Sequence, residues 1–226
     1  MKYAICLNER IEPYPNARGN CICCGADMIA KCGNVKIHHW AHKNKQHCDH
    51  WWANETQWHR DWKNNFPLEW QEVINISENG EKHISDVKTP AGLTIEFQHS
   101  AICEKEKNAR EKFYKQLIWI INGRRLKTDY EKFNSRPNLF PWKSWQYPEK
   151  HRINLPVKAF PSYKSWINRS VPVLFDWGLV DVDGYSTHQH LLCGLHKKNW
   201  FTIEKSELLN LLNSSGNFPV ESFLDI

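Results

Sequence analysis

The pattern of hydrophobic and polar positions predicts strands and helices that alternate along the chain. An apolar run at 3–7 predicts a short strand, and 51–66, which lacks glycine and proline, predicts a helix ending before Pro67. The segment 101–117 predicts a helix with Ile102, Ala109, Phe113 and Leu117 on its apolar stripe. The other expected elements are strands at 69–76, 82–89, 93–98, 118–121, 171–178 and 190–195, and a helix at 203–212.

This order, a helix, three strands, a helix and a strand, predicts a mixed α/β (α+β) fold. Two divisions of the chain follow from the pattern. We expect a small N-terminal module at 1–50 and a larger core at 51–226. Within that core, proline, tryptophan and lysine alternate without a clear period, so we expect an irregular insertion at about 130–170.

The strands at 82–89 and 93–98 predict a hairpin with a distinctive polar face. Pro90-Ala91-Gly92 fits a three-residue loop in which glycine takes a positive φ, and Thr89 then opposes Leu93. Counting back from that pair places Asp86 opposite Glu96. Adjacent carboxylates repel unless a cation lies between them, so the hairpin predicts a site for Mg²⁺ or Mn²⁺. The alternative is an ordinary amphipathic hairpin with a solvated polar face.

Two further residues share the polar face of this hairpin. Lys88 is expected to contact a phosphate oxygen, and Gln98 to position the attacking water.

Carboxylates gathered for a cation repel one another when the site is empty, so replacing Asp86, Glu96 or Glu55 by alanine is expected to cost little stability.

Composition adds the possibility of a nucleic-acid partner. The 226 residues include 30 Lys+Arg and 25 Asp+Glu, so the formal charge is 30 − 25 = +5, which permits binding to nucleic acid. The longest uninterrupted apolar runs, at 3–7 and 117–121, are far shorter than the roughly 20 residues that span a bilayer. With no secretory signal pattern either, we expect a cytoplasmic protein without a membrane partner.

Clustered cysteines and histidines predict a zinc site near the N-terminus. Cys21 and Cys24 form C-x2-C, and His39 and His42 form H-x2-H; two short ligand pairs joined by a loop suit tetrahedral Zn²⁺. The segment has little apolar content, so the metal is expected to organise it. Other residues of the same types offer alternatives for one or more of the four positions: Cys23, Cys32, His38, Cys48 and His50.

These motifs together resemble the competence protein CoiA-like family. The resemblance rests on C-x2-C followed by HWAH, a helix that bears Glu55 within ETQWHRDWK, then SDV, IEFQHSAI, REKFY and WIING, over about residues 21–122. It implies a PD-(D/E)XK nuclease core, a mixed sheet flanked by helices, in which glutamine replaces the motif lysine. The implied catalytic residues are Asp86, Glu96, Gln98 and Glu55, with zinc held by Cys21, Cys24, His39 and His42. This chain departs from the family in its surplus Cys and His and in Ile22, where proline is usual.

The leading functional hypothesis is metal-dependent hydrolysis of DNA, aided by the zinc module. Lys88, Lys105 and Arg110 are the expected phosphate contacts. One alternative is a non-catalytic zinc-ribbon adaptor that binds nucleic acid, and another is a nuclease whose chemistry lies in the His-rich run HHWAHKN. The sequence leaves open whether the DNA is single- or double-stranded, whether RNA is cut, whether cutting is endo- or exonucleolytic, the oligomeric state, and whether protein partners serve DNA uptake or defence.

Overall fold

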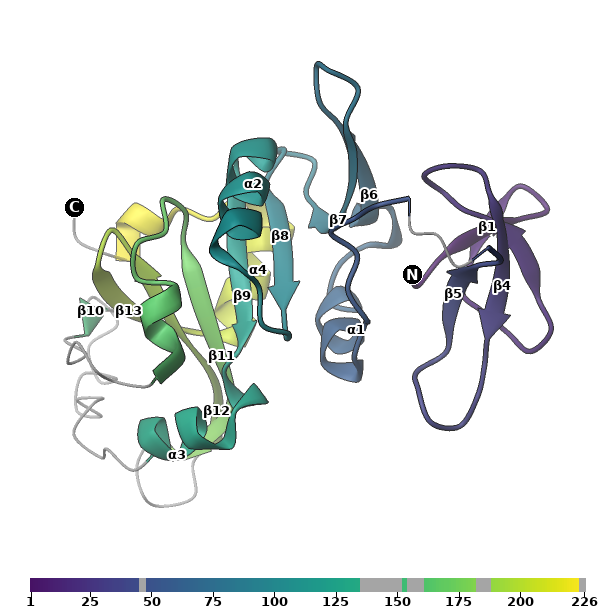
Figure 1. Cartoon of the computed structure of the whole chain (residues 1–226). Coiled ribbons are helices and arrows are strands. Elements are labelled where there is room, and N and C mark those ends of the chain that lie inside the picture. Colours follow the sequence, from purple (N-terminus) through teal and green to yellow (C-terminus); the bar gives the residue numbers. More distant parts are fainter. Residues whose placement is uncertain (45–47, 135–151, 154–160, 182–187, 224–226) are drawn as a thin grey trace. The chain divides into compact units, whose positions relative to one another are not determined.

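The computed structural model describes residues 1–44, 48–134, 152–153, 161–181 and 188–223. These residues form a mixed α+β structure with four α-helices (Figure 1), which confirms the predicted fold class. The chain divides into two compact units, 1–88 and 89–226. The predicted division at residue 50 stays a prediction about domain organisation, and most of the predicted insertion at about 130–170 lies outside the described residues.

The first unit contains a small antiparallel sheet and a helix followed by a strand pair. Strands β1 to β5 pair in the order β2-β1-β3-β4-β5. Strands β6 and β7 pair antiparallel, with Gln71 opposite Val87 and Val73 opposite Ser85. The bounds are β1 Ala4–Cys6, β2 Glu9–Ile11, β3 Arg18–Asn20, β4 Asp27–Lys31, β5 His39–His42, α1 Gln57–Lys63, β6 Gln71–Ile76 and β7 Lys82–Lys88.

The small sheet has a core of its own. Trp40 and Met28 are 1% exposed, and they pack with Ala4, Ala17 and Cys21. Burying large apolar side chains stabilises a fold by about 1.5–3 kcal/mol each. The segment therefore buries more apolar surface than its sequence pattern predicts, although a metal still has a place beside this core.

Helix α1 is shorter than predicted because Thr56 caps it. Thr56 has an extended backbone, its side chain accepts from the His59 backbone N–H, and the His59 side chain accepts from the Thr56 backbone N–H. Such a capping box fixes the first turn of a helix. The helix therefore begins at Gln57, and Glu55 lies just before it rather than within it.

The second unit is a mixed sheet with helices on it. Its strands follow the order β10-β13-β12-β11-β9-β8; β8, β9 and β11 are parallel to one another, and the rest pair antiparallel. In the view of Figure 1, α2 lies in front of this sheet and α4 behind it. The bounds are β8 Thr94–Gln98, α2 Glu104–Tyr114, β9 Leu117–Asn122, α3 Lys127–Asn134, β10 Arg152–Ile153, β11 Val173–Asp181, β12 His188–His196, β13 Asn199–Glu204 and α4 Lys205–Ser215.

The predicted turn before β8 is confirmed. Thr89 N–H donates to the Leu93 carbonyl at 2.9 Å, Gly92 N–H donates to the Thr89 carbonyl at 2.9 Å, and Gly92 has φ of +90°. All five residues of β8 are buried. Its polar face is therefore covered rather than solvated.

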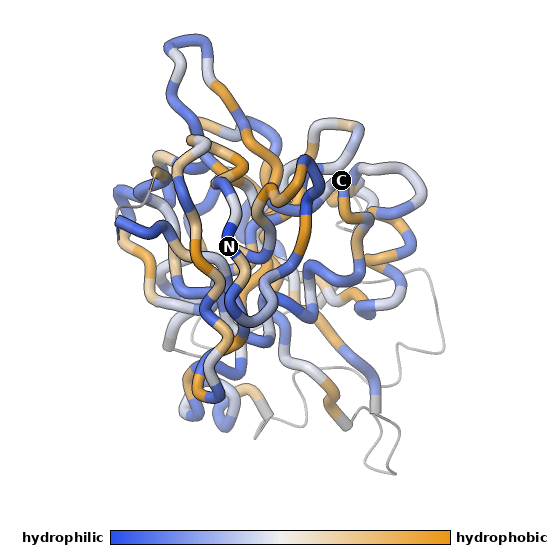
Figure 2. Tube along the Cα trace, turned by 90° about the vertical axis from the view of Figure 1, so that its right-hand side faces the viewer, coloured by the Kyte–Doolittle hydropathy of each residue, from blue (hydrophilic) through white to orange (hydrophobic). Residues whose placement is uncertain are grey.

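Helix α2 buries charged residues where an apolar stripe was predicted. Lys107, Arg110 and Tyr114 face inward, whereas Ala109 is exposed. The predicted stripe is wrong because polar partners decide which face is buried: the Lys107 ammonium donates to the Ser165 carbonyl and lies 4.7 Å from the Trp166 ring centroid. Hydrophobic and hydrophilic residues alternate over short stretches along much of the chain (Figure 2).

Candidate functional site

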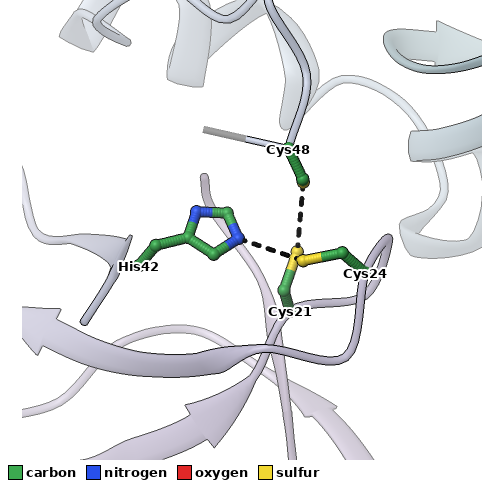
Figure 3. A group of neighbouring side chains, drawn as sticks. All are labelled: Cys21, Cys24, His42 and Cys48. Atoms are coloured by element: carbon green, nitrogen blue, oxygen red, sulfur yellow. Dashed lines mark hydrogen bonds between the residues drawn. The ribbon is translucent and has the colours of Figure 1, made fainter. Parts of the chain in front are cut away.

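Three cysteines and one histidine meet beside the small N-terminal sheet. Ligand atoms of Cys21, Cys24, His42 and Cys48 all lie within 4.8 Å of one another. Cys21 Sγ is 3.6 Å from Cys48 Sγ, and Cys24 Sγ is 3.3 Å from His42 Nε2. Figure 3 shows the four side chains pointing toward one another. We call these four residues the Cys/His cluster.

A tight turn presents the two cysteines of the C-x2-C pair. Gly25 N–H donates to the Cys21 carbonyl at 2.9 Å, and Gly25 has φ of +73°, where glycine is favoured. Cys23 N–H donates to Cys21 Sγ at 3.4 Å. The turn therefore places both thiols on one side of the backbone.

The distances and the ligand types fit zinc. Two sulfurs held about 2.3 Å from a tetrahedral zinc are separated by roughly 3.8 Å, close to what the cluster shows. Burial raises the pKa of the Cys21 and Cys48 thiols. A bound cation reverses this effect by stabilising thiolates, so the cluster suits a metal such as zinc.

The fourth residue of the cluster is Cys48, where the sequence predicted His39. His39 and His42 are three positions apart on strand β5, and residues three apart in a strand point to opposite faces. His39 Nδ1 instead lies 2.9 Å from the Ile37 carbonyl. The H-x2-H spacing would suit a turn or a helix; in a strand it can supply only one ligand to the same site.

Asp49 connects the Cys/His cluster to strand β7. Its carboxylate accepts from the Ile84 backbone N–H at 2.8 Å and lies 2.8 Å from His83 Nδ1. Trp51 stacks on the His83 ring, with centroids 3.3 Å apart. Asp49, His83 and the exposed His50 form a second group of possible metal ligands. Asp49, which follows Cys48, is therefore hydrogen-bonded to β7, the strand that carries Asp86.

Three carboxylates of the first unit surround one buried lysine. The Lys63 ammonium pairs with Glu55, with Glu72 at 3.1 Å and with Asp86 at 3.9 Å. The Lys63 side chain is 2% exposed, whereas that of Asp86 is 25% exposed. We call these four residues the acidic cluster. The structure therefore brings together Glu55 and Asp86, which the sequence singled out, with Glu72 and Lys63, which it did not.

Ion pairs set the charge states of this cluster. Burial alone would raise the pKa of Glu55, but Lys63 and Arg60 lower it to about 2. Arg60 is 2.8 Å from Glu55. Burial would lower the pKa of Lys63, but Glu72 and Glu55 raise it. Attraction to cations, not mutual repulsion, therefore governs Glu55, so its replacement should cost stability, contrary to the expectation from sequence.

In the second unit, Arg110 holds Glu96. Its guanidinium donates to Glu96 at 2.6 Å and to Glu106 at 2.5 Å. Arg110 is 7% exposed and Glu96 is 3% exposed. The structure thus places Arg110, expected from sequence to contact phosphate, in an internal ion pair. This pair fixes the Glu96 carboxylate.

The remaining predicted residues make local hydrogen bonds. Gln98, at the end of β8, donates through Nε2 to the Ser100 carbonyl at 2.8 Å and is 8% exposed. The Lys88 ammonium donates to Asn75 Oδ1 at 2.6 Å. Asp86 and Lys88 lie on β7 of the first unit, and Glu96 and Gln98 on β8 of the second.

Part of the chain matches a known protein family. Residues 82–174 match the family model of a nuclease-like domain, described as "Competence protein CoiA, nuclease-like domain". This match confirms the resemblance to the CoiA-like family over that part of the chain. No curated protein and no solved structure matches the chain.

Among the described residues, none of the helices has the length and apolar character needed to cross a membrane.

Proposed function

We propose that this protein is a metal-dependent nuclease of the PD-(D/E)XK type that hydrolyses phosphodiester bonds in DNA. The nuclease-like match supports the general class. The element order α1, β6, β7, β8, α2, β9 agrees with the order of helix, three strands, helix and strand that the sequence predicts. In this proposal the protein works in the cytoplasm on foreign DNA, during uptake or in defence.

The observation that carries the proposal is the acidic cluster. Glu55 and Asp86 are 31 positions apart in the sequence (86 − 55 = 31), yet both contact the ammonium of Lys63. Buried carboxylates gathered around a cation are costly for a fold and are typical of functional sites. The sequence singled out three carboxylates, Asp86, Glu55 and Glu96, and the side chain of Asp86 is the most exposed of the three. Solvent and substrate therefore reach Asp86 most easily.

Carboxylate oxygens of Asp86 and Glu96 are the hard ligands that Mg²⁺ or Mn²⁺ prefers. When bound, such a cation neutralises phosphate charge and lowers the pKa of a coordinated water. The protein's own residues do the positioning. Lys63 steadies Asp86 and Glu55, Arg110 steadies Glu96, Gln98 orients the attacking water, and Lys88 contacts a phosphate oxygen.

We assign zinc to the Cys/His cluster as a structural metal that shapes a DNA-binding module. Four protein ligands close a tetrahedral zinc site, whereas catalytic zinc keeps one position open. This favours the acidic residues over the His-rich run as the seat of the chemistry.

Cleavage assays with paired variants test the proposal. Purified protein is incubated with single-stranded DNA, double-stranded DNA and RNA, with and without Mg²⁺ or Mn²⁺. Asp86→Asn and Glu96→Gln should each lower the rate by about a hundredfold or more, because metal ligands contribute at least as much as the residues that support them. Asp61→Asn and Glu78→Gln change exposed carboxylates and should leave the rate unchanged.

Two results would count against this proposal. Binding of DNA without any metal-dependent cleavage favours the adaptor alternative. Equal cleavage by wild type and Asp86→Asn, with loss of cleavage in a folded His42 or His39 variant, moves the chemistry to the His-rich run.

A further inference from the structure

A pocket of about 230 Å³ opens in the second unit beside the end of β8. That volume is many times the roughly 10–15 Å³ that one ordered water requires. Its walls come from the segment after β8, the end of β9, α3, and the 3-10 helix Pro161–Ser165. Its lining residues include Gln98, Arg125, Asp129, Trp166, Phe175 and Trp177.

One wall carries a buried carboxylate with an unused acceptor. Asp129 is 2% exposed and lies in the first turn of α3. Its Oδ2 accepts from the Ser162 hydroxyl, while Oδ1 has no hydrogen-bond partner among the described residues. A buried acceptor left unpaired costs about 1–3 kcal/mol. A donor brought by a ligand would recover that free energy.

The other walls are aromatic and rigidly packed. Trp166, Phe175 and Trp177 line the pocket and are each at most 5% exposed. Phe133 stacks on Trp177 with centroids 4.0 Å apart, and Trp166 meets Trp119 edge to face at 5.4 Å. Flat rings that are already held in place bind another flat ring with little loss of side-chain entropy.

The rim joins the pocket to the proposed reaction site. Gln98, which is expected to position the attacking water, lines the pocket, as does the exposed Arg125. A nucleotide with its base in the pocket would therefore keep its phosphate close to an amide and a guanidinium. Guanidinium groups are strong phosphate partners.

We propose that this pocket binds one unpaired nucleobase that carries an exocyclic amino group, with the amino group donating to Asp129 Oδ1. Aromatic walls and one carboxylate acceptor match a flat ring with one N–H donor edge. A base with a carbonyl at the same position points an oxygen at the carboxylate and is disfavoured. The inference rests on the proposed nuclease function and specifies its substrate as DNA with an unpaired base next to the cut.

Oligodeoxycytidine and oligodeoxyuridine give the sharpest test. Cytosine carries an amino group where uracil carries a carbonyl, and the adjoining ring nitrogen is an acceptor in cytosine and a donor in uracil. Binding is measured by fluorescence anisotropy in buffer without Mg²⁺ or Mn²⁺ and without chelator, so that zinc is kept and nothing is cut. Wild type should bind oligodeoxycytidine about tenfold more tightly. Asp129→Asn should bring the ratio toward one. Glu131→Gln, which changes an exposed residue of the same helix, should keep it.

A ratio near one in wild type overturns the proposal, and so does an unchanged ratio in folded Asp129→Asn. If that variant does not fold, the wild-type ratio and the quenching of wild-type tryptophan fluorescence by deoxycytidine against deoxyuridine monophosphate decide the matter. Metal-dependent cleavage without base preference overturns this pocket alone. Base preference without metal-dependent cleavage overturns the nuclease function alone.

Discussion

The Cys/His cluster and the acidic cluster differ in how their closely spaced ionisable side chains are stabilised. Each gathers several ionisable side chains in the first unit. The Cys/His cluster contains no lysine or arginine, and burial raises the pKa of two of its thiols. The acidic cluster contains its own cation, since Lys63 contacts Glu55, Glu72 and Asp86.

This difference is what we expect if the first cluster binds a structural metal and the second binds a catalytic one. Thiols with raised pKa values become good ligands only with a metal present, so metal binding and folding are coupled. Carboxylates that are already neutralised by a lysine fold without a metal. In the proposed function, the Cys/His cluster would hold zinc permanently, and the acidic residues would take up Mg²⁺ or Mn²⁺ only when substrate arrives.

The largest expected effect comes from removing a zinc ligand. Cys48→Ser should reduce bound zinc from about one per chain to near zero and unfold the N-terminal sheet, because structural zinc contributes on the order of 10 kcal/mol. Elemental analysis and circular dichroism measure both outcomes. His39→Ala and Cys32→Ser are the matched controls and should retain zinc. Zinc lost in His39→Ala but kept in Cys48→Ser would restore the tetrad predicted from sequence.

Removing Lys63 should have the next largest effect. Lys63→Met leaves buried carboxylates without their cation and should lower the free energy of unfolding by about 3–5 kcal/mol. Denaturant titration followed by tryptophan fluorescence measures the change. Lys82→Met alters an exposed lysine and should stay within about 0.5 kcal/mol of wild type. Equal losses in the two variants would show that Lys63 does not balance the acidic cluster.

Acid should reveal the contribution of Glu55. Its pKa in the folded protein is about 2, below the ordinary value of 4.5, so its stabilisation is complete above about pH 4.5 and disappears as pH falls to about 2. Glu55→Gln should therefore be less stable than wild type at pH 7, by up to about 3 kcal/mol, and equally stable near pH 2. Thermal unfolding across this pH range measures the gap. The exposed Glu69→Gln should run parallel to wild type, and a gap for Glu55→Gln that does not close in acid would contradict the ion pairs.

The smallest effect should come from adding Mg²⁺ without DNA. Because Lys63 already neutralises the carboxylates, binding should be weak, and a Mg²⁺ concentration near the Kd adds only about 0.4 kcal/mol. Thermal shift with Mg²⁺ measures this. A rise in Tm comparable to that given by zinc would mean that the acidic residues form a strong cation site by themselves, and the contrast between the two clusters would fail.

The local pattern of the sequence predicted strands β1, β6 to β9, β11 and β12, but it did not predict β2 to β5, β10 or β13. The turn at Pro90-Ala91-Gly92 has the predicted pairing of Thr89 with Leu93, because proline fixes its own φ and glycine permits the positive φ that this turn requires. Helix α1 ends before Pro67 as predicted, but it begins at Gln57 because Thr56 caps it. The stripe predicted for 101–117 failed because apolar spacing does not reveal that Lys107 and Arg110 find partners across the fold.

In the candidate sites, too, some features were predictable from the sequence and others were decided by the tertiary structure. Residue type and short spacing predicted the Cys/His cluster near the N-terminus. The roles of Asp86, Glu96 and Glu55 in catalysis, which the family resemblance implies, stay a prediction. Tertiary structure decided that Cys48 completes the cluster in place of His39, and that Lys63 and Arg110 hold Glu55 and Glu96. The reason is physical: turns and strand faces depend on neighbours in sequence, whereas the counter-charge of a buried group depends on which distant side chain folding brings within a few ångströms.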